Sequence, residues 1–153
     1  MFQTVLTHPP LHSQLPSRAM SIRTDRVRLA GFLKKKQDLT TEEFLSYWLN
    51  NHGKLFSSLE IVKKNLLKYE QCHPSATAAG SLGQFIPLAN WDGMVIFEGE
   101  SYEKIMEVFT STEYLNTAVP DEKNFLDREA TQFLALDIAT IHLQNGSQGL
   151  ASL

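Results

Sequence analysis

This sequence has few of the residues that mark several common protein classes. Its 153 residues include a single cysteine, Cys72, which excludes an internal disulfide framework and favours a reducing compartment. The net charge of −3 offers no basic surface for nucleic acid or for an anionic membrane. No apolar run approaches the roughly 20 residues of a membrane-spanning helix. We therefore expect a cytoplasmic protein that binds neither nucleic acid nor membrane.

Motifs for metals and cofactors are also missing. No His-x-Glu-x-x-His or comparable spacing occurs, and His8, His12 and His142 lie near the chain ends. There is no glycine-rich phosphate loop and no nucleophile elbow around a serine. Cys72 alternates to the opposite strand face from His73, which argues against a Cys–His nucleophile. We expect neither a metal ion nor an organic cofactor.

What the sequence does contain is enough apolar surface for one core. Hydrophobic residues make up 42% of the chain, which fits a single domain, and we place this domain at residues 25–143. Residues 1–24 hold prolines, two arginines and no acidic residue, and they lack the apolar core of a secretory signal. We interpret residues 1–24 and 144–153 as flexible tails, with an organellar transit peptide as the alternative at the N-terminus.

The hydrophobic periodicity predicts four strands and two helical regions. The strands are expected at residues 26–34, 66–73, 91–99 and 129–143. The helical regions are expected at 40–64, with a bend or break near 50–53, and at 101–115, followed by a short turn that starts at Pro120. Thr40 and Glu43 have the spacing of a capping box at the first helix start. The order of elements predicts a ferredoxin-like α+β fold, βαββαβ.

The predicted sheet is apolar on both faces. In the last strand Phe133 and Ala135 share one face, while Leu134 and Leu136 share the other. Two helices can cover only one face of a four-stranded sheet, so the second face needs another cover. A second copy of the same sheet is the simplest one. We therefore expect a homodimer.

Residues 75–90 form the longest segment without a clear period. The segment is rich in alanine, glycine and serine, which bury little apolar surface, and it also contains Phe85, Ile86 and Leu88. Loops of this length in a compact domain are usually functional or mobile. We expect a mobile lid over a cavity, with Phe85 placed on the ligand.

His52 is the first candidate for chemistry. It follows Phe44, Tyr47 and Trp48 on the flank of an apolar helix stripe, so it points toward the gap between helix and sheet. Histidine as a residue type has an unperturbed pKa of about 6.5, which suits proton transfer at neutral pH. The alternative interpretation is a core histidine that bonds to a backbone carbonyl.

His73 and Asp92 are candidates to work with His52. His73 shares a strand face with Tyr69 and Gln71, so it is expected to approach the same cavity from the opposite wall. Asp92 is expected to orient one histidine, and a structural aspartate at a strand start is the alternative. By contrast, Pro120-Asp121-Glu122 reads as the first turn of a helix, with Phe125 packed on the core or the cavity.

Four stretches in this order resemble the EthD family: "LTTEEFLSYWLNNHGKLF", "LLKYEQCH", "WDGMVIFEG" and "VPDEKNFLD". The chain is most similar to small EthD-domain proteins encoded with fungal aromatic polyketide pathways. Some of these are described as decarboxylases of anthracenone carboxylic acids, and others as dehydratases. The resemblance implies a dimeric α+β barrel and a functional role for the histidine that follows the Tyr47–Trp48 pair.

The expected activity combines this resemblance with the candidate residues. We predict a cofactor-free lyase that decarboxylates a β-keto acid of an aromatic polyketide by histidine acid/base catalysis. Three alternatives remain open: a dehydratase or cyclase on the same substrate class, a cofactor-free oxygenase of anthrones, and a non-catalytic dimeric binding module. The expected catalytic residues are His52, His73 and Asp92, and the expected substrate-binding residues are Tyr47, Trp48, Tyr69, Gln71, Phe85 and Phe125.

Overall fold

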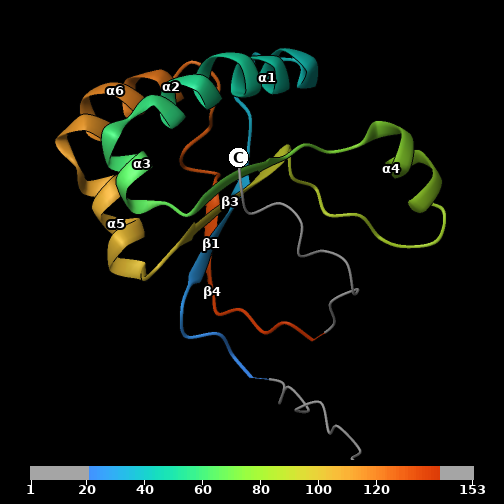
Figure 1. The fold of residues 1–153 in the computed structure, drawn as a ribbon. Coiled ribbons are helices and arrows are strands. Elements are labelled where there is room, and N and C mark those ends of the chain that lie inside the picture. The colour runs from blue at the N-terminus through green and yellow to red at the C-terminus, as the bar shows by residue number, and fades with distance from the viewer. Residues whose placement is uncertain (1–20, 142–153) are drawn as a thin grey trace, which may run out of the picture.

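The computed structural model describes residues 21–141, so most of the predicted tail at 1–24 and all of the predicted tail at 144–153 lie outside the described residues. One antiparallel sheet forms the centre of the described chain, and helices pack on one of its faces (Figure 1). Its strands are β1 (Val27–Leu33), β2 (Lys68–Cys72), β3 (Gly93–Gly99) and β4 (Gln132–Leu136). The strand order is β2-β3-β1-β4, which confirms the predicted ferredoxin-like fold.

The register of the sheet follows from the two-residue alternation of its strands. Ala30 pairs with Ile96 on one side and with Leu134 on the other, so these three side chains share a face. The neighbouring rows, such as Leu29 opposite Phe97, face the helices and belong to the core. No described helix packs on the face that carries Ile96 and Leu134 (Figure 1). The sheet therefore keeps one face without a described cover, and this face joins an apolar part around Ile96 and Leu134 to a charged row with Arg28 and Glu98.

The last strand is shorter than its apolar pattern predicts. β4 ends at Leu136, opposite Arg28, and only an isolated bridge between Ile22 and Ala139 continues the pairing. The predicted end at residue 143 is wrong within the described residues because β1 begins at Val27 and supplies no further strand to pair with. The apolar alternation of one strand does not show how long its neighbour is, so it cannot predict where the pairing between them ends.

The helices lie in two groups over the covered face of the sheet. Their bounds are α1 (Thr41–Tyr47), a π-helical turn η1 (Trp48–His52), α2 (Gly53–Ser58) and α3 (Glu60–Asn65), then α5 (Tyr102–Thr110) and α6 (Thr112–Glu122). The predicted capping box at the start of α1 is confirmed. The Thr40 hydroxyl accepts from the Glu43 amide at 3.2 Å, and the Glu43 carboxylate accepts from the Thr40 amide at 2.8 Å.

The second helical region is longer and more divided than predicted. A break at Ser111 separates α5 from α6, because the Ser111 hydroxyl accepts from the Tyr114 amide and caps a new helix. Pro120 lies inside α6, so the predicted helical turn that starts there is wrong. A proline usually marks a helix start, but burial of Tyr114, Ala118 and Glu122 holds α6 together across it.

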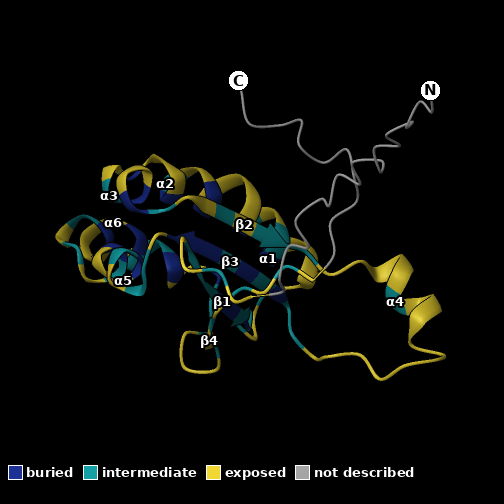
Figure 2. Cartoon of the chain, turned by 60° about the horizontal axis from the view of Figure 1, so that its bottom comes forward, coloured by how far each residue is buried: buried dark blue, intermediate teal, exposed yellow. Residues whose placement is uncertain are grey.

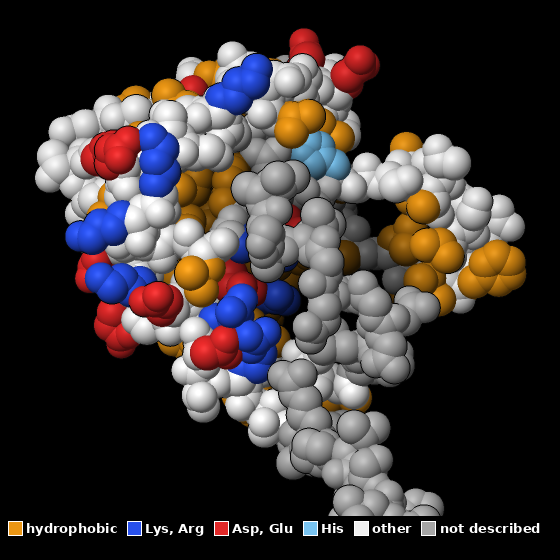
Figure 3. Space-filling view, viewed as in Figure 1, with side chains coloured by type: hydrophobic (Ala, Val, Ile, Leu, Met, Phe, Trp, Pro, Cys, Tyr) orange, Lys and Arg blue, Asp and Glu red, His pale blue; other side chains and the backbone are white. Residues whose placement is uncertain are grey.

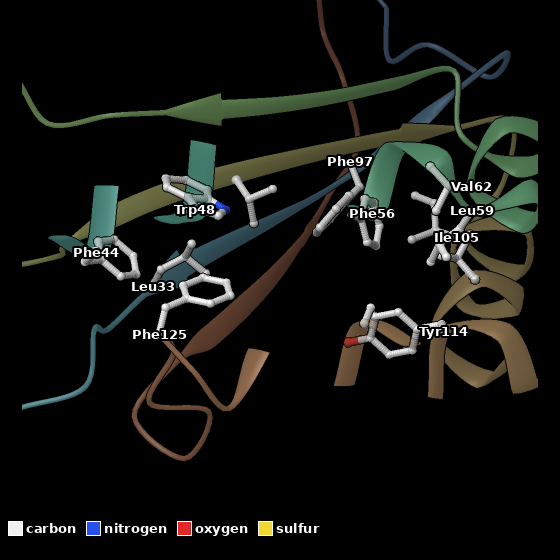
Figure 4. Close-up of a cluster of buried hydrophobic side chains, with 13 residues drawn as sticks. Leu33, Phe44, Trp48, Phe56, Leu59, Val62, Phe97, Ile105, Tyr114 and Phe125 are labelled. Carbon is white, nitrogen blue, oxygen red and sulfur yellow. The ribbon is translucent and has the colours of Figure 1, made fainter. Parts of the chain in front are cut away.

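The core lies between the helices and the sheet, as the dark band of buried residues in Figure 2 shows. Its largest side chains fall into two groups in Figure 4. Leu33, Phe44, Trp48 and Phe125 lie on one side, and Phe56, Phe97, Ile105 and Tyr114 on the other. The close aromatic pairs, such as Phe44–Phe125 at 5.8 Å between ring centroids, stabilise each group.

The segment 75–90 differs from the unstructured loop that the sequence predicts. It contains helix α4 (Ala76–Leu82), capped by the Ser75 hydroxyl, which accepts from the Ala78 amide at 3.2 Å. The segment stands away from the rest of the described chain and is almost entirely exposed (Figures 1 and 2). Among residues 21–141, none of the helices is both long and apolar enough to span a bilayer.

Candidate functional site

An apolar cavity of about 400 Å³ lies between the sheet and the helices. Its lining includes the aromatic side chains Trp48, Phe56, Tyr69, Phe97, Phe109, Tyr114, Phe125 and Phe133. Figure 4 shows Trp48 and Phe125 on one side of the gap and Phe56, Phe97 and Tyr114 on the other. The volume lies in the range of about 300–1,000 Å³ that small-molecule sites occupy. The predicted substrate-binding residues Trp48, Tyr69 and Phe125 therefore do line a cavity.

His52 enters this cavity from the π-helical turn. The Gly53 amide donates to the Trp48 carbonyl five residues earlier, so η1 holds one more residue than an α-helical turn. The His52 side chain is buried in the cavity wall at 6% exposure, with Phe125 at 4.9 Å and Phe56 at 5.9 Å between ring centroids. The bend predicted near residues 50–53 is thus a short π-helical turn, a feature often found at functional sites.

Gly53 allows strand β2 to approach this turn closely. A side-chain carbon at Gly53 would lie 2.9 Å from the Gln71 amide nitrogen. That nitrogen donates to the Trp48 carbonyl at 2.9 Å and to the Tyr69 hydroxyl at 2.8 Å. Gln71 therefore joins β2 to the π-helical turn by a hydrogen bond, and it does not line the cavity where a ligand would bind.

Asp121 is the partner of His52. Its carboxylate accepts from His52 Nδ1 at 2.8 Å and from the Tyr47 hydroxyl at 2.7 Å. The Asn124 side chain donates to the Tyr47 hydroxyl at 3.0 Å, and the bond to Asp121 raises the pKa of Tyr47. Because Asp121 accepts at Nδ1, His52 bears its proton there when neutral, and Nε2 is its second nitrogen. Nε2 has no hydrogen-bond partner among residues 21–141, so it is available to a ligand in the cavity.

The role of Asp121 corrects the prediction from sequence. Pro120-Asp121-Glu122 was interpreted as a structural helix start, whereas Asp121 in fact orients His52 and Glu122 lines the cavity. Spacing along the chain could not show this contact, because 69 residues separate His52 from Asp121. The available signal was the "VPDEKNFLD" stretch, which carries the family resemblance.

Tyr69 supplies a hydroxyl to the cavity wall. Burial raises its pKa to about 12, and the hydrogen bond from Gln71 opposes that shift only in part. The hydroxyl therefore stays protonated at neutral pH. It can donate a hydrogen bond to a ligand oxygen, but it is not a base.

A second polar group lies where α6 meets the next loop. Glu122 accepts from the Tyr114 hydroxyl at 2.7 Å and from the Arg128 guanidinium at 2.6 Å, and all three residues line the cavity. Burial raises the pKa of Tyr114 above its usual value, and the adjacent Glu122 charge raises it further. None of these three residues was among those predicted from the sequence.

His73 does not reach the cavity, so the prediction that it faces His52 across it is wrong. Its ring stacks on Trp48 at 4.8 Å between centroids, Nε2 bonds to Gln71 at 3.0 Å, and it borders a separate shallow groove. His73 follows Tyr69 by four residues, or about 13 Å along an extended chain, which carries it past the end of the cavity. Burial lowers the pKa of His73.

Asp92 and Phe85 also lie outside the cavity. The Asp92 carboxylate accepts from the Lys35 amide at 3.0 Å and joins the end of β1 to the start of β3, so the prediction that it orients a histidine is wrong. Phe85 is 83% exposed, and it belongs to an apolar cluster with Leu82, Ile86 and Leu88 on the protruding segment, as Figure 3 shows around α4. No residue of 75–90 lines the cavity, so the predicted cover over it is not present.

The described residues include no candidate metal centre. Within residues 21–141, no group of three or more His, Cys, Asp or Glu side chains is close enough to hold a metal ion. The polar groups of the cavity are instead linked to one another, as the pairs His52–Asp121 and Arg128–Glu122 show. This arrangement suits proton transfer and hydrogen bonding in an apolar site.

Comparisons with known proteins agree with this fold. The EthD domain family matches residues 36–129. A dimeric protein of unknown function with a ferredoxin-like fold from Bacteroides fragilis is 14% identical, with a TM-score of 0.51, covering 78% of this chain and all of that one. An ethyl tert-butyl ether D (EthD) family protein from Bacillus halodurans is 12% identical, with a TM-score of 0.51, covering 74% of this chain and 98% of that one. The search of curated proteins returned no match. The chain belongs to the EthD-domain family.

Proposed function

We propose that this protein is a cofactor-free lyase that decarboxylates a β-keto acid of an aromatic polyketide, such as an anthracenone carboxylic acid. The observation that supports this proposal is the His52–Asp121 pair, joined at 2.8 Å in the wall of an apolar cavity. A histidine held by a carboxylate at one nitrogen can transfer a proton at the other. The alternative of a merely structural core histidine gives no reason for a second nitrogen without a partner among residues 21–141.

The reaction needs one proton and no oxidant. His52 in its protonated form donates from Nε2 to the ketone oxygen of the bound β-keto carboxylate. The bond to the carboxylate carbon then breaks, carbon dioxide leaves, and the electron pair becomes part of an enolate stabilised by the same N–H. The enolate carbon takes the proton, and solvent returns one to His52. Asp121 accepts from Nδ1 throughout and stabilises the positive ring.

The cavity walls suit a flat, apolar substrate. Phe56, Phe97, Trp48 and Phe125 present ring faces and edges on both sides of the gap (Figure 4). An apolar surrounding also favours loss of a carboxylate charge as neutral carbon dioxide. Tyr69 adds a hydroxyl that can bind a substrate oxygen.

We also propose that the protein is a homodimer through the open sheet face. That face carries Ile96 and Leu134 in one row, and Leu134 is half-exposed. The similar protein from Bacteroides fragilis is dimeric. Isologous packing of two such faces would bury both apolar surfaces at once.

Product analysis with purified protein tests the activity. We expect incubation with an anthracenone carboxylic acid to yield the decarboxylated anthracenone at equal rates under air and under nitrogen. A product formed only under air, with oxygen consumption, would identify an oxygenase instead. Loss of water without loss of carbon dioxide would identify a dehydratase. No product at all, together with a measurable dissociation constant for the acid, would leave a binding module.

A further inference from the structure

The lining of the cavity is buried in one part and exposed in another. His52 belongs to the buried part, whereas Met106, Leu115 and Phe133 line the cavity and are about half exposed. Arg128 also lines the cavity, and its side chain is 45% exposed. An elongated ligand whose reacting atom lies at His52 therefore extends toward Arg128.

Arg128 is held at this rim by a buried carboxylate. Its NH1 group donates to Glu122 at 2.6 Å, and Glu122 is fixed from the other side by the Tyr114 hydroxyl at 2.7 Å. One guanidinium nitrogen is thus engaged by Glu122, and the guanidinium also lies close enough to the Tyr114 hydroxyl to lower the pKa of Tyr114 in part. A guanidinium has five N–H donors in a planar fork, so donors remain for a ligand.

Two acidic residues neighbour Arg128 in the sequence, Asp127 and Glu129, and neither forms an ion pair with its guanidinium among the described residues. The Asp127 carboxylate accepts from the Ala130 amide at 3.2 Å, and its backbone is bonded to Lys34 and Thr131. Glu122 is therefore the carboxylate that orients Arg128 among the described residues. The Arg128–Glu122 pair is neutral overall, so the subsite depends on the remaining guanidinium N–H donors. Hydrogen bonds from these donors to an anion are screened less beside an apolar wall than on an open surface.

We propose that Arg128 forms a subsite for an anionic oxygen group, a carboxylate or an ionised phenol, at the far end of a flat substrate from the atom on which His52 acts. This deepens the proposed function, because it names a feature of its substrate. When Arg128 binds this remote anionic group, it positions the reacting end of the substrate at His52. It does not act on the charge that develops at the reacting carbon. Glu122 acts through Arg128 as a positioning residue.

A pair of matched ligands tests the subsite by binding alone. Anthracene-2-carboxylate and its neutral analogue anthracene-2-carboxamide are titrated into the protein and followed by ligand fluorescence. Because hydrogen bonds to charged groups are the strong ones, wild type is expected to prefer the carboxylate by at least about tenfold in dissociation constant. Arg128→Gln should bind both ligands alike, with carboxamide affinity unchanged.

Three further variants complete the experiment. Glu122→Gln/Arg128→Gln avoids leaving a buried carboxylate unpaired, and it should also lose the preference. Arg23→Gln removes an arginine that pairs with the exposed Asp25 and does not line the cavity, so it should keep the preference. His52→Gln should keep it as well.

The outcomes separate this subsite from the proposed reaction. No preference in wild type, or a preference that survives in both Arg128 variants, would refute the subsite. Loss of the preference in His52→Gln would place the anion at His52 and refute it too. A preference that follows Arg128 in a protein that never decarboxylates a β-keto acid would uphold the subsite while the proposed reaction fails.

Discussion

At the scale of single residues, His52 and Asp121 carry the proposed chemistry. His52→Gln keeps roughly the volume and some hydrogen bonding but cannot transfer a proton. We expect it to stay folded and to lose about 10²–10⁴ in kcat. Asp121→Asn should lower kcat by a similar order with a smaller change in KM, because it removes the charge that stabilises the protonated ring.

His73→Gln is the matched control for His52→Gln. His73 is half-buried and stacks on Trp48, but it borders a separate groove. His73→Gln should therefore keep wild-type turnover. Steady-state kinetics and thermal unfolding are measured for all three variants. If His52→Gln lowers the melting temperature but keeps the wild-type kcat, His52 is a structural core residue and not a catalytic one.

Tyr69 gives a pH dependence of stability that can be measured without a substrate. Its pKa of about 12 in the folded protein exceeds the value near 10 of an unfolded chain, since burial disfavours the charged form. Between these two pH values the folded state keeps a proton that the unfolded state has lost. The stabilisation is therefore complete below pH 10 and lost as pH rises toward 12.

We expect Tyr69→Phe to reduce this alkaline loss of stability. Urea unfolding at several pH values should show a shallower decline, by up to about 1.4 kcal/mol per pH unit. Tyr114, whose pKa is also raised by burial, accounts for part of the decline that remains. An equally steep decline in Tyr69→Phe would show that Tyr69 ionises without a cost to folding.

At the scale of elements, the contact between the π-turn and β2 depends on Gly53. The backbone of Gly53 is α-helical, so alanine is allowed there and would favour the helix by about 1 kcal/mol. The added carbon, however, displaces the Gln71 side chain from the Trp48 carbonyl, which costs a hydrogen bond of similar size. Gly53→Ala should therefore change the free energy of unfolding little.

The same substitution behaves differently once Gln71 is shortened. In a Gln71→Ala background the clash with Gln71 is gone, and the tight contact that remains is with the Trp48 carbonyl oxygen at 3.2 Å. Gly53→Ala should then stabilise the protein by up to about 0.5–1 kcal/mol. Denaturant unfolding of the four proteins in this double-mutant cycle measures the coupling. Additive effects of the two substitutions would contradict the close contact.

At the scale of the whole molecule, the open sheet face predicts the oligomeric state. We expect wild type to sediment as a dimer at micromolar concentration. Leu134→Arg places a charge on the open face and, by two-fold symmetry, places like charges together, so it should give a monomer. Leu49→Arg is the control, because Leu49 is equally exposed but borders the groove beside His73. A wild-type protein that sediments as a monomer would contradict both the proposed dimer and the dimeric α+β barrel.

The protruding segment of residues 75–90 also belongs to this scale. Its Phe85 cluster is exposed in the single chain, and Figure 3 shows these hydrophobic side chains on the part that stands away around α4. The sequence predicts a mobile lid over the cavity here, whereas no residue of the segment lines the cavity in the structure. The sequence did not reveal α4, because alanine-rich stretches bury nothing that sets a period.

Local chemistry made much of the fold readable from sequence. The Thr40–Glu43 capping box and the alternation through β1 depend on residues within a few positions of one another, and both are confirmed. The predicted bend or break near residues 50–53 is a π-helical turn through which the chain stays helical, and the break lies instead at Leu59, where the backbone is extended. Element order then follows from these local signals, and the order of six elements is enough to indicate a ferredoxin-like fold.

The partners of the site were decided by tertiary structure alone. Sequence periodicity placed His52 on the inner face of its helix, and the structure places it in the cavity wall. It assigned His73 and Asp92 as partners, whereas the structure brings Asp121 to His52 and puts Arg128 at the rim. Periodicity reports which side of an element faces the core, because side chains repeat along one axis. It holds no information on where two elements distant in sequence cross, since packing across the sheet sets that position.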